Sequence, residues 1–155
     1  MRARDIMRQP VVTTSLEATA REVALLMRDR GHAGLPVVDE EGRVVGMVTE
    51  TDLLHLALPR WLEGVGDLSF LPENAGPYLE AFREVADRPL REFLGERPVP
   101  VAEEEDSLLE VIRLMTQHRV RRIPVVRESR LTGIITREDV MAALFDPSLG
   151  NREEK

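Results

Sequence analysis

The sequence predicts an α/β fold of the α+β kind, made of two pseudo-symmetric repeats that share a core. The main observation is a duplication, because residues 32–54 recur as residues 120–141. The residues that reappear are Pro36, Val37, Val38, Glu40, Arg43, Gly46, Thr49 and Asp52, matched by Pro124, Val125, Val126, Glu128, Arg130, Gly133, Thr136 and Asp139. A second observation is that helical periodicity and short β-rich runs alternate in the same order in both copies. Each repeat is therefore predicted as strand, helix, strand, strand, helix.

In the first repeat, a short extended segment is expected at 10–13, followed by a helix that begins with a capping box at Thr19 and Glu22. Gly31 is expected to end that helix. Strands follow at 35–38 and 44–48, joined by an acidic turn, and Thr49 opens a further helix. The expected buried stripe of the first helix is Ala20, Val23, Ala24 and Met27.

The second repeat has the same signals. Ser107 and Glu110 form the expected capping box, strands are predicted at 123–126 and 131–135, and Thr136 opens the last helix. The expected buried stripe here is Leu108, Val111, Ile112 and Met115.

These elements divide the chain into repeat 1 at 1–58, an aromatic-containing insert at 59–89, repeat 2 at 90–146 and a polar tail at 147–155. The insert is not a flexible polar linker, because it holds Trp61, Phe70, Tyr78 and Phe82. Pro77 suits the first turn of a helix whose apolar stripe is Tyr78, Ala81, Phe82 and Val85. The insert is expected to pack on its own module or on a dimer mate; the alternative is a lid or a surface that docks a partner.

Composition narrows the function classes. The formal net charge of -7 argues against nucleic acid or an anionic membrane as the main partner. There is no cysteine, so disulfides, thiol nucleophiles and thiolate metal sites are excluded. No apolar run is long enough for a membrane span and no signal peptide is recognisable, so a cytoplasmic protein is expected.

The paired strings LPVV…GMVTETD and IPVV…GIITRED resemble the CBS domain, which usually occurs in tandem pairs called Bateman modules. The resemblance covers about residues 3–58 and 90–145. It implies two pseudo-twofold related repeats that pack through small sheets and leave two clefts between them. These clefts commonly bind adenosine compounds such as AMP, ADP, ATP or S-adenosylmethionine. It also implies a homodimer and a regulatory role that needs no cofactor besides the regulatory ligand.

The residues of the motif allow the same chemistry. A hydroxyl and a carboxylate at a strand-to-helix junction lie beside free backbone amides that favour an anion. By resemblance, Asp52 and Asp139 hold ribose, and Thr49 and Thr136 hold phosphate. The alternative is purely structural, because Thr-x-x-Asp is itself a helix capping box.

The second repeat is predicted as the stronger site. Arg119, Arg121 and Arg122 precede its strand, where the first repeat has glycines. Arg119 resembles a phosphate-binding arginine of energy-sensing CBS proteins, and a planar guanidinium suits phosphate. Arg121 is a second candidate, whereas Arg121 and Arg122 could instead pair with the acidic run 103–106. An apolar slot for adenine is expected from Leu35, Ile123, Val11 and Val99, although a core would need the same residues.

Catalysis finds little support. The three histidines, His32, His55 and His118, have no metal-ligand spacing, and no nucleophile motif or Walker loop is present. The sequence therefore predicts a non-enzymatic sensor of an adenine nucleotide or another adenosine ligand that acts on an unknown effector protein. The alternative is an interaction or dimerisation module that binds no ligand.

Overall fold

The computed structural model describes residues 1–58, 62, 64–67, 69–70, 76–95, 98–146 and 148, and it contains two compact units. Unit 1 consists of residues 1–13, 38–45 and the described residues from 98 onward. Unit 2 consists of residues 14–37 and the described residues from 46 to 95. The units do not coincide with the two sequence repeats, because residues 1–13 of repeat 1 belong to unit 1 and residues 90–95 of repeat 2 belong to unit 2.

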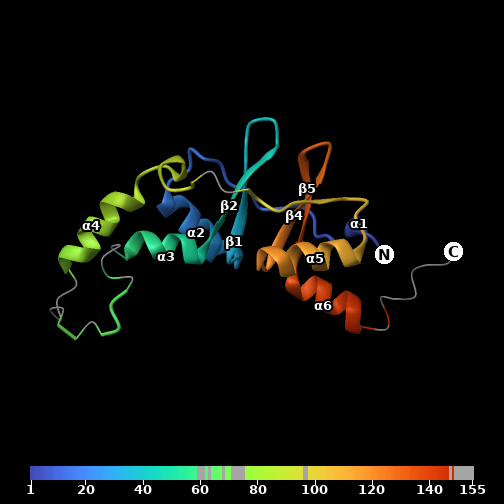
Figure 1. Cartoon of the computed structure of the whole chain (residues 1–155). Coiled ribbons are helices and arrows are strands. Elements are labelled where there is room, and N and C mark those ends of the chain that lie inside the picture. The colour runs from blue at the N-terminus through green and yellow to red at the C-terminus, as the bar shows by residue number, and fades with distance from the viewer. Residues whose placement is uncertain are drawn as a thin grey trace. The chain divides into compact units, whose positions relative to one another are not determined.

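Unit 1 is built on a three-stranded sheet. Its elements are α1 (Ala3–Ile6), β3 (Ala102–Glu103), α5 (Leu108–His118), β4 (Arg122–Arg127), β5 (Arg130–Thr136) and α6 (Arg137–Phe145). The strand order is β3-β4-β5, with β3 parallel and β5 antiparallel to the central β4. Helices α5 and α6 lie side by side against these strands (Figure 1). The core of the unit contains Ala3, Ala102, Val111, Met115, Ile123, Val125, Ile135 and Val140.

Unit 2 repeats this plan with a two-stranded sheet. Its elements are α2 (Ala20–Arg30), β1 (Gly34–Val38), β2 (Val44–Thr49), α3 (Glu50–Ala57), α4 (Gly76–Ala86) and the 3-10 helix η2 (Leu90–Glu92); the ends of β1 and β2 that flank the turn are counted with unit 1. Helices α2, α3 and α4 contact one another (Figure 1). The buried apolar residues are Ala20, Val23, Met27, Leu35, Val37, Val48, Leu62, Ala86 and Leu90.

Each repeat begins with a segment that packs on the body of the other repeat. We call residues 1–13 the first lead-in and residues 88–95 the second lead-in. In unit 1, backbone hydrogen bonds join Ala3 N to Asp106 O (2.8 Å), Arg4 N to Glu104 O (3.1 Å) and Leu108 N to Met1 O (3.1 Å). In unit 2, the matching bonds join Leu90 N to Ala18 O (2.8 Å), Arg91 N to Leu16 O (2.9 Å) and Ala20 N to Arg88 O (3.2 Å). The exchange of lead-ins therefore obeys the pseudo-symmetry of the sequence.

Helix caps follow the sequence signals at three of four positions. Thr19, Thr49 and Thr136 each accept a hydrogen bond from the backbone of the third helical residue, whose carboxylate binds the cap backbone in return. Only one of the two hydrogen bonds of the capping box predicted at Ser107 is present. Ser107 accepts from Glu110 N, but no reciprocal bond forms, and the Glu110 carboxylate pairs with Arg113 one turn on.

The other predicted elements are mostly confirmed. Gly31 ends α2 with a φ of 67°, and the four main strands lie within a residue or two of the predicted ranges. The first strand of repeat 1 is wrong as an element of its own, because only an isolated parallel bridge between Thr14 and Val37 forms there. The same pairing in repeat 2, Ala102 with Val125, extends far enough to make β3.

The helix predicted in the insert is present as α4, with a shifted buried face. Ala86 is buried and Phe82 and Val85 are half-buried, whereas Tyr78 and Ala81 are exposed. The insert packs on its own unit through this face, since α4 contacts α2 and α3. Trp61 lies outside the described residues.

Gly133 in unit 1 and Gly46 in unit 2 each lie under a lead-in, and the two positions differ in the space that they leave for a larger side chain. A Cβ added at Gly133 would lie 2.8 Å from Met7 Cγ and 2.9 Å from Met7 Cβ, so Met7 would have to move. We expect Gly133→Ala to reduce the free energy of unfolding by about 1 to 3 kcal/mol. At the matching Gly46, the new Cβ would meet Val37 and Leu94 at 3.6 and 3.7 Å, so Gly46→Ala is the control and should cost less than about 1 kcal/mol. Urea unfolding measures both, and equal losses would contradict the packing described here.

The C-cap of α5 carries an avoidable backbone strain. Arg119 takes the left-handed conformation with a φ of 53°, in the position that Gly31 occupies after α2. We expect Arg119→Gly to stabilise the protein by about 0.5 to 1 kcal/mol and Gly31→Arg to destabilise it by a similar amount. Thermal and urea unfolding would check both changes. A loss of stability in Arg119→Gly would mean that the arginine side chain contributes more than the strain removes.

Candidate functional site

The motif Thr-x-x-Asp of repeat 2 forms a compact polar cluster at the start of α6. Thr136 donates to the Asp139 Oδ2 atom from both its backbone N (2.9 Å) and its Oγ1 (2.7 Å). Asp139 N in turn donates to Thr136 Oγ1 at 3.3 Å. The motif therefore caps the helix, as the structural alternative predicts, and this capping engages one of the two carboxylate oxygens.

The second carboxylate oxygen is held by Arg8. Its Nε and Nη2 atoms lie 2.7 and 2.6 Å from Asp139 Oδ1. Two backbone hydrogen bonds place Arg8 there, from Arg8 N to Ile134 O (2.8 Å) and from Ile134 N to Arg8 O (3.2 Å). The first lead-in thus brings an arginine to a carboxylate 131 residues further along the chain.

The two partners of this ion pair differ in exposure. The Asp139 side chain is 11% exposed, whereas the Arg8 side chain is 64% exposed. Burial acts to raise the pKa of Asp139, but hydrogen bonds from Arg8 and Thr136 outweigh burial and hold that pKa below its ordinary value. The hydrogen bond to Asp139 raises the pKa of Arg8. The carboxylate is therefore charged near neutral pH, and the guanidinium reaches it from the solvent side.

The motif of repeat 1 has the same cap. Thr49 donates to Asp52 Oδ2 from its backbone N (2.8 Å) and its Oγ1 (3.0 Å). The two motifs are therefore alike as helix caps. The exchanged lead-ins match at an offset of 87, since Met7 packs at Gly133 and Leu94 at Gly46.

The arginines ahead of β4 are placed by the backbone. Arg119 is exposed at the C-cap of α5, and Arg121 is exposed with its carbonyl accepting a hydrogen bond from Arg137 N at 2.8 Å. Arg122 is half-buried, and its charge lowers the pKa of Glu138 as a minor contribution beside hydrogen bonds from the α6 backbone and Thr136. Contact of Arg119 or Arg121 with a ligand stays a prediction.

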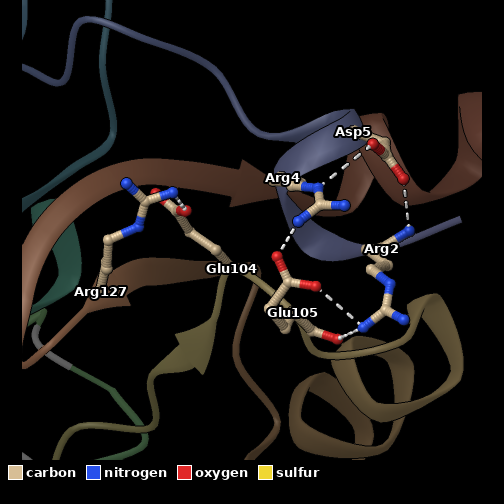
Figure 2. A network of polar contacts seen from close by, with 6 residues as sticks. All are labelled: Arg2, Arg4, Asp5, Glu104, Glu105 and Arg127. Carbon is tan, nitrogen blue, oxygen red and sulfur yellow. Dashed lines mark hydrogen bonds and ion pairs between the residues drawn. The ribbon is translucent and has the colours of Figure 1, made fainter.

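Arg2, Arg4 and Arg127 form ion pairs with the acidic run 103–106. Arg127 Nη2 lies 2.5 Å from the buried Glu104 carboxylate, and Glu105 binds both Arg2 and Arg4. Figure 2 shows both groups of side chains, with Arg2, the N-cap residue of α1, and Arg4 reaching towards Glu105. These ion pairs help to fix the lead-in on unit 1. Pairing of Arg121 and Arg122 with this run stays a prediction.

The residues predicted to form an apolar slot differ in burial. Leu35 and Ile123 are 1% and 0% exposed and lie in the cores of units 2 and 1. Val11 and Val99 are half-buried. Val11 lines a hollow of about 560 Å³ in unit 1, together with Gln9, Pro10, Thr13, Val38, Gly42, Leu131 and Thr132. A second hollow of about 470 Å³ lies beside Arg2, Arg4 and Glu105. Neither of these two hollows includes Thr136 or Asp139.

Arg8 is the site residue that sequence reasoning missed. Nothing in the motif of repeat 2 identifies it, because it belongs to the lead-in of repeat 1. The sequence repeat is the signal that could have identified Arg8. The lead-in of repeat 1 pairs with β5 of repeat 2, and this pairing brings Arg8, the residue after Met7, close to the end of that strand.

Neither a metal site nor a membrane-spanning helix is found in the part of the chain that the structure describes. No group of three or more histidine, aspartate or glutamate side chains there could hold a metal ion. None of the described helices has the length and apolar character needed to cross a bilayer.

Comparison with known proteins identifies the fold family. A family model for the CBS domain matches residues 3–58 and 90–146. The Bacillus subtilis protein YlbB is 35% identical over 145 residues, covering 86% of this chain and 82% of that protein. The Methanocaldococcus jannaschii protein MJ1426 is 31% identical, covering 94% and 92%.

A solved structure agrees with these matches. The CBS domain of a CBS domain-containing membrane protein from Sphaerobacter thermophilus is 31% identical and superposes with a TM-score of 0.70, covering 91% of this chain and 86% of that one. The two motifs, the duplicated fold and these matches lead to one conclusion: the chain belongs to the CBS domain family and contains a tandem pair of CBS domains.

Proposed function

We propose that this CBS pair is a non-catalytic, cytoplasmic regulatory module that binds an adenine nucleotide or another adenosine ligand, such as AMP, ADP, ATP or S-adenosylmethionine. The observation that carries the proposal is the cluster at the start of α6. There the charged Asp139 carboxylate accepts hydrogen bonds from the Thr136 hydroxyl on one oxygen and from Arg8 on the other. A carboxylate suits ribose hydroxyls, and a guanidinium beside a helix N-terminus suits phosphate.

Proteins of the same fold support the ligand class. CBSX2 has been solved in complex with AMP, with 23% identity and a TM-score of 0.70. The CBS pair of MJ0100 has been solved with 5′-methylthioadenosine and S-adenosylmethionine, with 23% identity and a TM-score of 0.66. At such identities the likeness establishes the shared fold, so the ligand class of this chain rests on its own residues.

The mechanism we propose is thermodynamic linkage. A ligand transmits a signal only if it binds one conformation of the module more tightly than another. An effector protein would read the favoured conformation. Repeat 2 is the stronger site in this proposal, with Asp139 on ribose and Thr136 at the phosphate edge, because Arg8 holds a positive charge against the Asp139 carboxylate.

A thermal-shift screen tests the ligand class directly. Adenosine, AMP, ADP, ATP, S-adenosylmethionine and NAD are added separately to the full chain. A ligand at about a hundred times its Kd should add about 2.7 kcal/mol to the free energy of unfolding. If none of these compounds shifts the melting temperature, the interaction module without a ligand becomes the better interpretation.

Replacing the carboxylate tests the site. We expect Asp139→Ala to weaken binding of the compound found in the screen by about 10- to 150-fold, the effect of losing a charged hydrogen bond of about 1.5 to 3 kcal/mol. Asp52→Ala removes the matching cap in repeat 1 and is the control, with a smaller effect on the stronger site. Unfolding of both variants is measured alongside, because loss of a cap costs about 0.5 to 2 kcal/mol by itself. Equal effects of the two changes on affinity would contradict the assignment to repeat 2.

We also propose that the module is a homodimer that pairs through exposed apolar side chains of its helices. Met141, Leu144 and Phe145 on α6 are 51%, 49% and 73% exposed, and Leu54 on α3 is 68% exposed. Leu54 and Met141 occupy matching positions of the two repeats. Several exposed apolar side chains gathered on one helix are typical of an interface.

Sedimentation equilibrium tests the dimer. The wild-type chain should sediment as a dimer and the double variant Met141→Glu/Phe145→Glu as a monomer, because two buried charges would oppose the interface. Leu79→Glu, at an exposed leucine of α4, is the control and should stay dimeric. A monomeric wild-type chain would contradict the proposal.

A further inference from the structure

The Arg8–Asp139 ion pair limits how the proposed site can accept a ligand. Asp139 Oδ2 already accepts two hydrogen bonds from Thr136, so Oδ1 is the oxygen with capacity left for a ribose. Both Arg8 nitrogens lie on that Oδ1 atom. A ribose diol that uses Oδ1 must therefore displace the guanidinium or share the oxygen with it.

The arginine can leave without disturbing the fold. Its backbone is fixed by the two hydrogen bonds to Ile134, whereas its side chain is 64% exposed. The guanidinium can therefore reorient by rotation about side-chain bonds alone. Its charge lies beside the N-terminal end of α6, where the helix dipole also favours an anion. Glu138 is the nearby negative charge that opposes an anion, and the positive charge of Arg122 acts on it.

A neutral ligand and an anionic ligand meet this ion pair differently. A neutral nucleoside that takes Asp139 Oδ1 leaves the guanidinium without the partner it had. A nucleoside phosphate takes the same oxygen with its ribose and offers phosphate oxygens to the displaced guanidinium, which binds phosphate through two parallel hydrogen bonds. The phosphate therefore replaces the interaction that the ribose breaks.

We propose that Arg8 is a specificity-determining residue of the repeat 2 site: it closes the Asp139 carboxylate to neutral nucleosides and opens it to nucleoside phosphates. This inference rests on the proposed function. It makes the first lead-in of the chain part of the site that the motif of repeat 2 forms. Arg8, rather than Arg119 or Arg121, is the arginine that the structure holds against the motif.

Isothermal titration of the full chain with adenosine, AMP and ADP tests the proposal. The wild-type chain should bind AMP at least about 10-fold more tightly than adenosine. Arg8→Gln should weaken AMP binding by about 10- to 100-fold and leave adenosine binding unchanged or tighter, so that the preference for phosphate falls to within about 3-fold. Arg8→Lys, which keeps the charge and loses the paired nitrogens, should fall between the two.

The matched control is Arg21→Gln. Arg21 makes an ion pair with Asp87 in unit 2 that has the same Nε–Oδ1 distance, 2.7 Å. The variant Arg21→Gln should therefore leave the affinities for adenosine, AMP and ADP unchanged. A preference for AMP that persists in Arg8→Gln overturns the role of Arg8 while the proposed function stands. Absence of binding of all three compounds to the wild-type chain and to Arg8→Gln overturns both. Urea unfolding checks that each variant folds, and Arg8→Lys carries the test if Arg8→Gln does not.

Discussion

The exchange of lead-ins is the constraint on which the rest of the structure depends. Ala3 belongs to the core of unit 1 and Leu90 to that of unit 2, and each comes from the repeat whose body lies in the other unit. Neither repeat can complete its core from its own residues. Gly133 is part of this constraint, because any side chain there would meet Met7 of the lead-in. Duplication of the sequence therefore does not produce two independent domains.

The same constraint forms the candidate site. Capping by Thr136 fixes the orientation of the Asp139 carboxylate, and the lead-in backbone, paired with β5, supplies the arginine that neutralises it. Capping engages Asp139 Oδ2 and Arg8 engages Oδ1, so the cap does not occupy the oxygen that the proposed ligand would use.

Local signals predicted most of the fold. Capping at Thr19, Thr49 and Thr136, the C-cap glycine Gly31 and the four main strands are decided by residues within a few positions, and these predictions are confirmed. Competition between side chains explains the half-formed box at Ser107, since Glu110 pairs with Arg113 instead. Sequence periodicity also could not predict which of the apolar residues of α4 would be buried.

The candidate site was only half predictable, for a physical reason. Thr136 and Asp139 carry their signal in a local motif, whereas Arg8 reaches them through strand pairing over a long sequence separation. The acidic run 103–106 shows the same limit. Sequence reasoning did not predict that Arg2 and Arg4, about 100 residues earlier in the chain, form ion pairs with Glu105 of this run (Figure 2).

Hydrogen exchange of a chain that lacks residues 1–13 tests the central claim most directly. The Ile134 amide donates to Arg8 O in the full chain, so we predict that deletion removes its protection along with that of the rest of β5. Amides of α2 in unit 2 should keep most of their protection, and a synthetic peptide of residues 1–13 should restore protection in β5. Unchanged protection of Ile134 and its neighbours after the deletion would contradict the account.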